Sequence, residues 1–183
     1  MKLLIKIYTR LFSILTILKF KLLYGSKFKC SFSARLCPSL KVTIRKKGKL
    51  IIGKKVSLRD YITLNVTGGT LTLEDQVFIN DFSSLNCRDS ILIKENARLG
   101  QGVKVYDSDH DYKKDIIDSY LNSPVQIGSY SWIGSDAIIL RGSIVGNNSV
   151  VGAGAVVKAN VPDNTLYVNK RTDKYISINR SNK

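Results

Sequence analysis

The sequence predicts a parallel β-helix, a coil of short strands in which each turn stacks on the turn before it. The first observation is an aliphatic residue at every sixth position from 127 to 157, with Gly directly after four of the six: Ile127, Ile133, Ile139, Val145, Val151 and Val157. A period of six fits neither an α-helix, which repeats about every 3.6 residues, nor an amphipathic strand, which repeats about every two. It fits a short-repeat coil in which every turn buries the same rung.

A looser form of the same repeat precedes this run and is the second observation. It consists of three triplets at six-residue spacing: Ile52, Leu58 and Leu64; Leu73, Ile79 and Leu85; Ile93, Leu99 and Val105. The register slips between the triplets, first across residues 67–70. Each triplet would form one turn of a triangular coil, and small residues such as Gly suit the backbone conformations of its corners. Residues 111–126 leave the register and are too long for a corner, so we expect a protruding loop there.

The 183 residues are expected to form one domain with short appendages. We predict a basic amphipathic N-terminal segment at 1–40, the β-helix domain at 41–168 and a basic C-terminal tail at 169–183. The cysteines are odd in number and form no CxxC pair, so we interpret all three as free thiols in a reducing compartment. They are Cys30, Cys37 and Cys87.

Positive charge is concentrated in the N-terminal third of the chain. Residues 1–59 contain sixteen Lys or Arg and no Asp or Glu, whereas residues 60–183 contain thirteen basic and fourteen acidic residues and have a net charge of −1. This asymmetry indicates an anionic partner at the N-terminal end, such as a membrane surface, nucleic acid or an acidic substrate. A solvated basic face that only adds solubility is the simpler interpretation.

Residues 2–23 predict a basic amphipathic helix. Apolar residues follow helical spacing, and basic residues fall largely opposite them; the apolar set is Leu3, Leu4, Ile7, Leu11, Ile14, Leu15, Leu18 and Leu22. The longest uncharged stretch, 11–18, is far short of the ~20 residues that span a bilayer. Lys19 and Lys21 interrupt the pattern of a signal peptide. The helix is therefore expected to lie on an anionic membrane surface or to pack on the domain or on another subunit.

His110 is the only histidine of the chain, and it comes just before the predicted loop. An imidazole titrates near neutral pH, which suits a general base. Asp107, Asp109 and Asp111 surround it, and one carboxylate would orient the imidazole; Asp109 and Asp107 are our candidates, although strand alternation turns the acids away from His110. One histidine, with cysteines at no zinc-ligand spacing, excludes a three-histidine metal site, and no metal is expected.

Three stretches resemble the hexapeptide-repeat acyltransferases: 124–157, VYDSDHDY at 105–112 and VFINDF at 77–82. The likeness covers roughly residues 50–168. It is closest to the galactoside and maltose O-acetyltransferase type and to acetyltransferases of capsule, O-antigen and exopolysaccharide clusters. The resemblance implies a left-handed coil, a homotrimer with active sites between adjacent subunits, and acetyl-CoA as the donor. The left hand does not follow from the repeat itself.

The resemblance also implies roles for individual residues. His110 would be the catalytic base, Asn80 would contact the acceptor sugar and Trp132 would wall the donor site. A turn-forming role for Asn80 and edge packing for Trp132 are the alternatives. The pantetheine arm of CoA would lie along a small-residue block, made of Gly134, Ser135, Gly152, Ala153 and Gly154.

The cations for the CoA phosphates depart from the family pattern. The usual Thr-Lys pair is replaced by Lys158 followed by Ala159, and the usual Gly-Asn-Pro-Ala-Lys turn is replaced by residues 169–172. Lys158, Lys170 and Arg171 are the remaining candidates, because their charged groups suit phosphate oxygens.

These observations predict an acetyl-CoA-dependent O-acetyltransferase that acts on a sugar hydroxyl of a bacterial surface polysaccharide or its lipid-linked precursor. The expected location is the cytoplasm, free or peripheral on the inner face of the cytoplasmic membrane, with residues 2–23 on the anionic surface. An N-acetyltransferase of a nucleotide-linked amino sugar would use the same base and donor and stays open. A non-enzymatic basic β-helix, as a scaffold or binding protein, is the other class; nucleic acid is not expected, since no RNA-binding motif is present.

Overall fold

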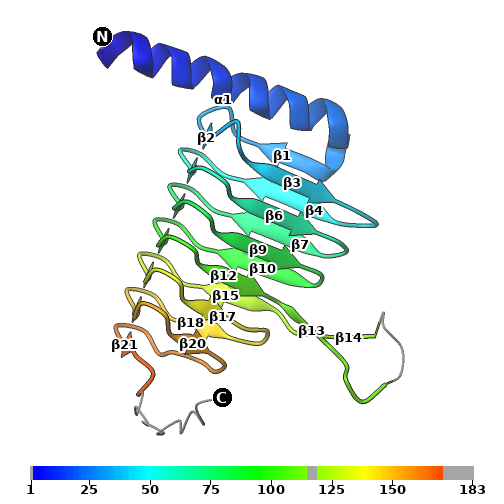
Figure 1. The fold of residues 1–183 in the computed structure, drawn as a ribbon, viewed down its shortest axis with the longest axis vertical. Coiled ribbons are helices and arrows are strands. Elements are labelled where there is room, and N and C mark those ends of the chain that lie inside the picture. The colour runs from blue at the N-terminus through cyan, green and yellow to red at the C-terminus, as the bar shows by residue number, and fades with distance from the viewer. Residues whose placement is uncertain (1, 115–118, 171–183) are drawn as a thin grey trace, which may run out of the picture.

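The computed structural model describes residues 2–114 and 119–170, and the side chains of the N-terminal helix from Ile7 onward. One long helix, α1 (Lys2–Tyr24), is followed by a single 3-10 turn, η1 (Gly25–Lys27), and then by a coil of about six turns (Figure 1). Each turn of the coil gives one short strand to each of three parallel sheets. The predicted left-handed parallel β-helix is therefore confirmed.

The three sheets, here called A, B and C, form the sides of a triangular prism. Sheet A contains β1 (Phe28–Cys30), β4 (Lys49–Ile52), β7 (Thr70–Leu73), β10 (Ser90–Ile93), β15 (Val125–Ile127) and β18 (Ile144–Val145). Sheet B contains β2 (Arg35–Leu36), β5 (Ser57–Leu58), β8 (Phe78–Ile79), β11 (Arg98–Leu99), β16 (Trp132–Ile133), β19 (Val150–Val151) and β21 (Leu166–Tyr167). Sheet C contains β3 (Lys41–Ile44), β6 (Thr63–Val66), β9 (Ser84–Cys87), β12 (Lys104–Tyr106), β17 (Ile138–Ile139) and β20 (Val156–Val157). The corners between them form three rows, which we call the A–B, B–C and C–A edges.

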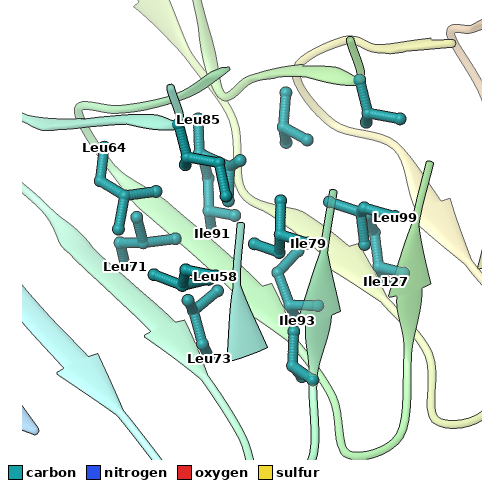
Figure 2. Packing of buried hydrophobic residues seen from close by; sticks show 14 of the residues in the cluster. Leu58, Leu64, Leu71, Leu73, Ile79, Leu85, Ile91, Ile93, Leu99 and Ile127 are labelled. Carbon is teal, nitrogen blue, oxygen red and sulfur yellow. The ribbon is translucent and has the colours of Figure 1, made fainter. Parts of the chain in front are cut away.

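The predicted rung residues line the interior of the prism, where equivalent side chains of successive turns stack (Figure 2). Leu58 pairs with Ile79 and Leu99 with Ile133, in register. Every residue of the triplets and of the 127–157 run is at most 2% exposed. Full burial of such a side chain contributes about 1.5–3 kcal/mol, so this continuous column holds the coil together. The hexad prediction is confirmed.

The slips in register all fall at the C–A edge. In the early turns the strands on both sides of that edge are four residues long, so Val66 and Leu71 are buried in addition to the rung residues. These extra buried residues lengthen the spacing between successive rung residues at this edge beyond six. From β17 onward the strands have two residues, and the period of six becomes regular.

The corners differ from the expectation that small residues would fill them. Among the described residues, several bulky side chains occupy the left-handed backbone region, including Tyr61 (φ 56°), Phe82 (φ 61°) and Tyr130 (φ 59°). This conformation costs a non-glycine residue about 1–2 kcal/mol. The stacked corners impose it, and the side chains avoid the crowded interior because they point to solvent; all three are about 60% exposed.

Two boundaries differ from those predicted. The coil begins at Phe28, which pairs with Leu50, so residues 28–40 belong to the first turn rather than to the N-terminal segment. The loop predicted at 111–126 is part of a longer projection, whose stem is an antiparallel hairpin of β13 (Ser108–His110) and β14 (Tyr120–Asn122) (Figure 1). It ends before β15, because Val125 is buried in sheet A. We call residues 107–124 the arm.

Helix α1 lies across the N-terminal end of the coil and covers its first turn (Figure 1). Ile17 and Phe20 are buried against the coil. Ser13 Oγ accepts the N–H of Leu36 at 2.8 Å and donates to the carbonyl of Ala34 at 3.1 Å. The helix thus packs on its own domain, one of the two expected arrangements. In the described part of the chain no helix is both long and apolar enough to span a bilayer.

Candidate active site

His110 lies on the arm and is exposed. Its strand places it opposite Tyr120, and the two rings are 4.4 Å apart between centroids at an interplanar angle of 41°. The guanidinium carbon of Arg88 lies 3.2 Å from the centroid of the Tyr120 ring. A cation over an aromatic face is attracted by the ring quadrupole. Arg88 therefore fixes Tyr120, and Tyr120 in turn supports the imidazole.

Asp107 lies at the base of the arm and is fully buried. Its carboxylate accepts the N–H of Arg88 at 2.8 and 3.0 Å and the N–H of Asp89 at 2.8 Å. Hydrogen bonds to an ionised acceptor are stronger than neutral ones. Asp107 thus fastens the corner that carries Arg88 to the base of the arm. This is a structural role, and the contacts described for its carboxylate do not include His110.

The two other acids near His110 also have partners of their own. Asp109 pairs with Arg141 on the next turn, with Nε and Oδ2 2.7 Å apart. Asp111 accepts the N–H of Lys113 at 3.2 Å and lies 3.7 Å from the ammonium of Lys114. The contacts described for these two acids do not include His110. In the described part of the chain, the side chain packed against His110 is Tyr120, which sequence reasoning missed because residues ten apart give no local signal.

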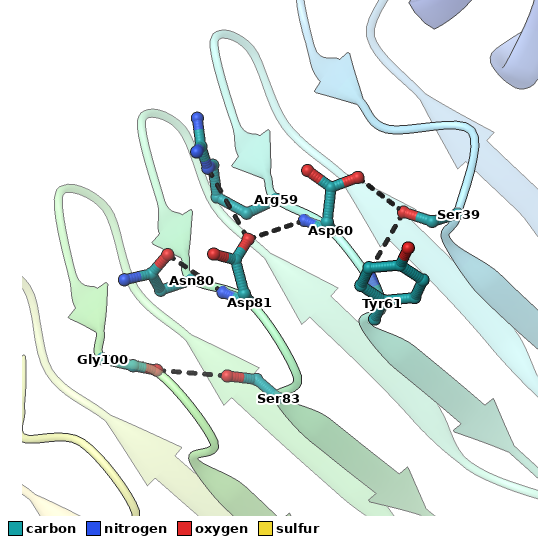
Figure 3. Close-up of polar contacts among 8 residues, drawn as sticks. All are labelled: Ser39, Arg59, Asp60, Tyr61, Asn80, Asp81, Ser83 and Gly100. Carbon is teal, nitrogen blue, oxygen red and sulfur yellow. Dashed lines mark hydrogen bonds and ion pairs between the residues drawn. The ribbon is translucent and has the colours of Figure 1, made fainter.

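The B–C edge carries Asn80 at the corner position that later turns fill with Gly134 and Gly152. The backbone N–H of each of the three bonds to the next turn of the coil, at 2.8–3.0 Å. Asn80 Oδ1 accepts the N–H of Asp81 at 3.0 Å, as a turn-forming Asn does (Figure 3). Asp81 in turn accepts the N–H of Asp60 at 2.9 Å. Asn80 thus belongs to a ladder of polar corner residues.

An exposed aromatic pair lies on the same edge, beside Asn80. The rings of Tyr61 and Phe82 stack with centroids 5.3 Å apart and planes 4° from parallel. Each residue is 61% exposed. Sequence reasoning missed this pair; the available signal was that Tyr61 and Phe82 both follow a rung residue, Leu58 or Ile79, by three positions.

The small-residue block also lies on the B–C edge. Ser135 and Ala153 occupy equivalent exposed corners of successive turns, and the N–H of Gly154 bonds to the carbonyl of Ser135 at 2.7 Å. A shallow hollow beside Ala153 is lined by Gly152, Ala153, Ala155, Val168 and Asn169. These short side chains leave the edge accessible to an extended chain of atoms, so the residues present fit a pantetheine arm.

Gly134 and Gly152 also lie close to the next turn of the coil, which the sequence did not show. A Cβ on Gly134 would lie 2.6 Å from the backbone nitrogen of Ala153, and a Cβ on Gly152 would lie 3.0 Å from Val168 Cγ1. The contact at Gly134 is with the backbone of the next turn and would force the turns apart, whereas the Val168 side chain could move by a few tenths of an ångström. Gly134 is therefore required by the stacking of turns, apart from any ligand.

The candidate cations for phosphate groups are divided between edges. Lys170 is exposed at the B–C edge, just after the residues that line the hollow. Lys158 is exposed at the C–A edge, on the side of the coil that bears the arm. Arg171 lies outside the described residues. Trp132 is 56% exposed on the outer face of sheet B, where it pairs with Arg98 and Val150.

The predicted site residues therefore form two groups. The C–A edge carries His110, Asp107, Asp109 and Lys158. The B–C edge carries Asn80, Gly134, Ser135, Gly152, Ala153, Gly154 and Lys170, with Trp132 on the adjoining sheet. The imidazole and the small-residue block therefore lie at different corners of the prism.

Comparison with known proteins gives the family. Residues 124–159 match the family described as bacterial transferase hexapeptide (six repeats). A probable acetyltransferase of Mycobacterium tuberculosis is 32% identical over 124 residues, which are 66% of this chain and 41% of that protein. The chain thus spans about two fifths of the length of this curated relative.

Solved structures show the same coil. A point mutant of AntD, an N-acyltransferase from Bacillus cereus, in complex with dTDP and coenzyme A superposes with a TM-score of 0.71 at 20% identity, over 82% of this chain and 83% of that chain. A hexapeptide-repeat acetyltransferase from Vibrio cholerae, complexed with acetyl-coenzyme A, gives a TM-score of 0.58 at 28% identity, over 62% of this chain and 63% of that one. With its stacked hexads and its matching repeats, the chain belongs to the hexapeptide-repeat transferases.

Proposed function

We propose that the protein is an acetyl-CoA-dependent O-acetyltransferase that modifies a sugar hydroxyl of a bacterial surface polysaccharide or its lipid-linked precursor. The observation that carries the proposal is the exposed imidazole of His110, supported by Tyr120 on a projecting arm of a hexapeptide-repeat coil. The accessible edge at Ser135 and Ala153 supports acetyl-CoA as the donor. So do the relatives, two of which were solved with coenzyme A or acetyl-coenzyme A.

His110 would act as the general base. A sugar hydroxyl is a weak nucleophile at neutral pH, and removal of its proton by a positioned imidazole accelerates attack by about 10²–10⁴-fold. The hydroxyl oxygen bonds to the thioester carbonyl carbon while its proton passes to the imidazole. The carbon–sulfur bond then breaks, and the imidazolium returns the proton to the leaving thiolate. The products are the acetyl ester and CoA, and His110 ends as it began.

The active site would lie between two protomers of a homotrimer. His110 and the small-residue block occupy different edges of one coil, so an arm must reach the B–C edge of a neighbour to meet a bound thioester. Lys158 would then approach the neighbour's donor site from the arm side, and Lys170 would approach it from its own B–C edge. Both lysines are exposed and free to meet phosphate oxygens from these two sides.

The acceptor would bind where the half-buried Asn80 lies beside the exposed Tyr61–Phe82 pair. Flat aromatic faces pack against apolar faces of ring systems, and the Asn80 amide can donate to a hydroxyl. All three residues lie on the B–C edge, several turns from Ala153, so a saccharide of more than one ring fits the distance better than a small alcohol.

Acylation of an amino sugar is the second candidate function. The observation that favours it is the likeness to AntD over most of both chains, since AntD is an N-acyltransferase that was also solved with dTDP-4-amino-4,6-dideoxyglucose and coenzyme A. An amine acceptor would use the same base and the same donor edge. The two functions differ only in the atom that attacks.

The test is acetyl transfer from labelled acetyl-CoA to a panel of oligosaccharides, lipid-linked saccharides and nucleotide-linked amino sugars. We expect ester products that are labile to mild base, and a loss of rate of at least about 100-fold in His110→Ala. Tyr112→Ala is the matched control, because Tyr112 is 86% exposed on the same arm. Base-stable amide products would establish the second candidate instead. An active His110→Ala trimer would refute the proposed mechanism.

A further inference from the structure

One apolar surface of the molecule is left uncovered by the fold. Five residues of α1 at helical spacing, Ile7, Leu11, Leu15, Leu18 and Leu22, are between 46% and 91% exposed. With 3.6 residues per turn these side chains fall in one row along the helix. We call them the apolar stripe. A continuous exposed row of large aliphatic side chains marks an interaction surface.

The stripe lies on the side of α1 that faces away from the coil. The opposite side carries the contacts with the first turn, through Ser13, Thr16, Ile17 and Phe20, all at most 9% exposed. Because the helix lies across the N-terminal end of the coil (Figure 1), the stripe forms the outer surface of that end. The helix is therefore anchored by a small, partly polar face, and its most apolar face is presented outward.

Positive charge surrounds the stripe. Lys19 and Lys21 flank it on its two sides by helical spacing, with the Lys21 ammonium 4.1 Å from the centroid of the Phe32 ring. Exposed basic residues continue from η1 through the first turn to the start of β4: Lys27, Lys29, Arg35, Lys41, Arg45, Lys46, Lys47 and Lys49. Residues 1–59 contain no acid. Within the part of the chain that the structure describes, all three ion pairs fall at Arg59 or later, so none neutralises this region.

We propose that α1 docks the protein on an anionic lipid bilayer, with the stripe buried among the acyl chains near the headgroups. Such a surface suits both the acyl-chain layer and the headgroup layer of an anionic bilayer. The apolar stripe would move from water into hydrocarbon, and the basic residues around it would reach the anionic headgroups. The coil would then stand away from the membrane, with the arm and both candidate site edges free. The proposal does not depend on which acceptor the enzyme acylates.

A second copy of the chain is the other possible occupant, and charge argues against it. Two such ends brought face to face would bring together the exposed basic residues of both protomers, none of which forms an ion pair among the described residues before Arg59. Like charges at close range oppose association. An anionic lipid surface supplies the missing negative charge, whereas another copy adds to the excess.

The test is co-sedimentation of the full-length protein with vesicles of phosphatidylcholine alone or with about one third phosphatidylglycerol. We expect binding to the anionic vesicles at low salt, at least about tenfold weaker binding to phosphatidylcholine alone, and weakening as salt screens the lysines. Lys46→Gln with Lys47→Gln should weaken binding only to the anionic vesicles.

Two neighbouring leucines supply a matched pair of variants. Leu22 lies on the stripe and is 91% exposed; Leu23 is 62% exposed but lies off it. Leu22→Gln should weaken binding about tenfold, as loss of one buried leucine implies, and Leu23→Gln by less than about twofold. Neither touches the core, so both should keep the wild-type melting temperature. Equal effects of the two variants, absence of binding to anionic vesicles, or a change of oligomer mass in Leu22→Gln without any lipid binding would each overturn the proposal.

Discussion

Asp107 and Cys87 show how single residues serve the scaffold close to the candidate base. Asp107 is buried because its carboxylate binds the backbone of the corner at 88–89. Cys87, at the end of β9, is 1% exposed. Burial, and after it the negative charge and hydrogen bond of Asp107, raise the pKa of the Cys87 thiol well above its ordinary value of 9.0. The thiol therefore stays protonated and inert when the protein is folded.

This raised pKa gives a prediction for stability against pH. In the unfolded chain Cys87 loses its proton above pH 9, whereas in the folded protein it keeps it. The unfolded state is then favoured as the pH rises, so the stabilisation by the neutral thiol is complete below pH 9 and is lost above it. The loss per pH unit is about 1.4 kcal/mol.

Urea unfolding of wild type and Cys87→Ala at several pH values between about 8 and 11 measures this loss. We expect the advantage of wild type over the variant to shrink by about 1.4 kcal/mol per pH unit above pH 9. Ser90→Ala, a neighbour that does not ionise, should differ from wild type by a constant amount. Parallel curves for wild type and Cys87→Ala would contradict the raised pKa.

At the scale of elements, the arm sets the position of the candidate base, His110, opposite Tyr120. The imidazole is exposed, and Tyr120 is the side chain packed against it within the described protomer, itself covered by Arg88. If His110 is the base, as proposed, Tyr120 is its positioning residue. A misplaced base transfers protons poorly, and a displacement of about 1 Å can reduce turnover about 100-fold.

Replacement of Tyr120 tests this role. Tyr120→Leu should lower kcat roughly 10- to 100-fold while the KM for acetyl-CoA stays unchanged, because the donor edge is elsewhere. Tyr120→Phe keeps the ring and should restore most of the rate. Tyr112→Leu, on the exposed part of the arm, should behave as wild type. Steady-state kinetics separates the outcomes: a rise in KM alone, or an inactive Tyr120→Phe, would show that the ring does not position His110.

The elements also show what the sequence could predict and what it could not. The interior follows from the hexads, because one aliphatic side chain per side of the prism is enough to define every turn. The start of the coil at Phe28 was missed, although Cys30, Leu36 and Val42 keep the six-residue spacing and pair in register with Ile52, Leu58 and Leu64. The stem of the arm was missed because its pairing of His110 with Tyr120 is not local.

The contacts of the candidate site were less predictable than its members. A residue's place on an edge follows from its position in the repeat, as for Asn80, Ser135 and Ala153. The partner of a charged side chain depends on the next turn, which for Asp109 brings Arg141 from 32 residues away, so this acid pairs with Arg141 and not with His110. The outward face of α1 was predictable, because helical spacing alone defines it, but the small polar face that anchors the helix was not.

At the scale of the whole molecule, the proposed function requires more than one protomer. The proposed base, His110, stands on the C–A edge, and the proposed donor block lies on the B–C edge of the same prism. A site shared between neighbours would explain why the coil has a long projecting arm at all. It also means that each protomer of a ring contributes two half-sites, one to each neighbour.

Subunit mixing distinguishes a shared site from a site within one protomer. His110→Ala removes the base, and Ala153→Trp fills the donor edge at a residue that is exposed and therefore tolerant of a larger side chain. Each homotrimer should be inactive. When equal amounts are unfolded together and refolded, about a quarter of the sites in random trimers combine an intact arm with an intact neighbouring edge. About a quarter of wild-type activity should therefore return.

The control is a mixture in which one protein carries both substitutions and the other carries neither. If the site is shared, about a quarter of the sites in this control mixture are intact, as in the mixture of single variants. If the site lies within one protomer, about half of the sites in the control mixture are intact, and the mixture of single variants has no intact site. Differently tagged chains, purified in succession, confirm that mixed trimers have formed. If mixed trimers of the single variants form but are inactive, His110 and the donor site act within the same protomer. The arm would then have to fold back over its own coil to join the two edges.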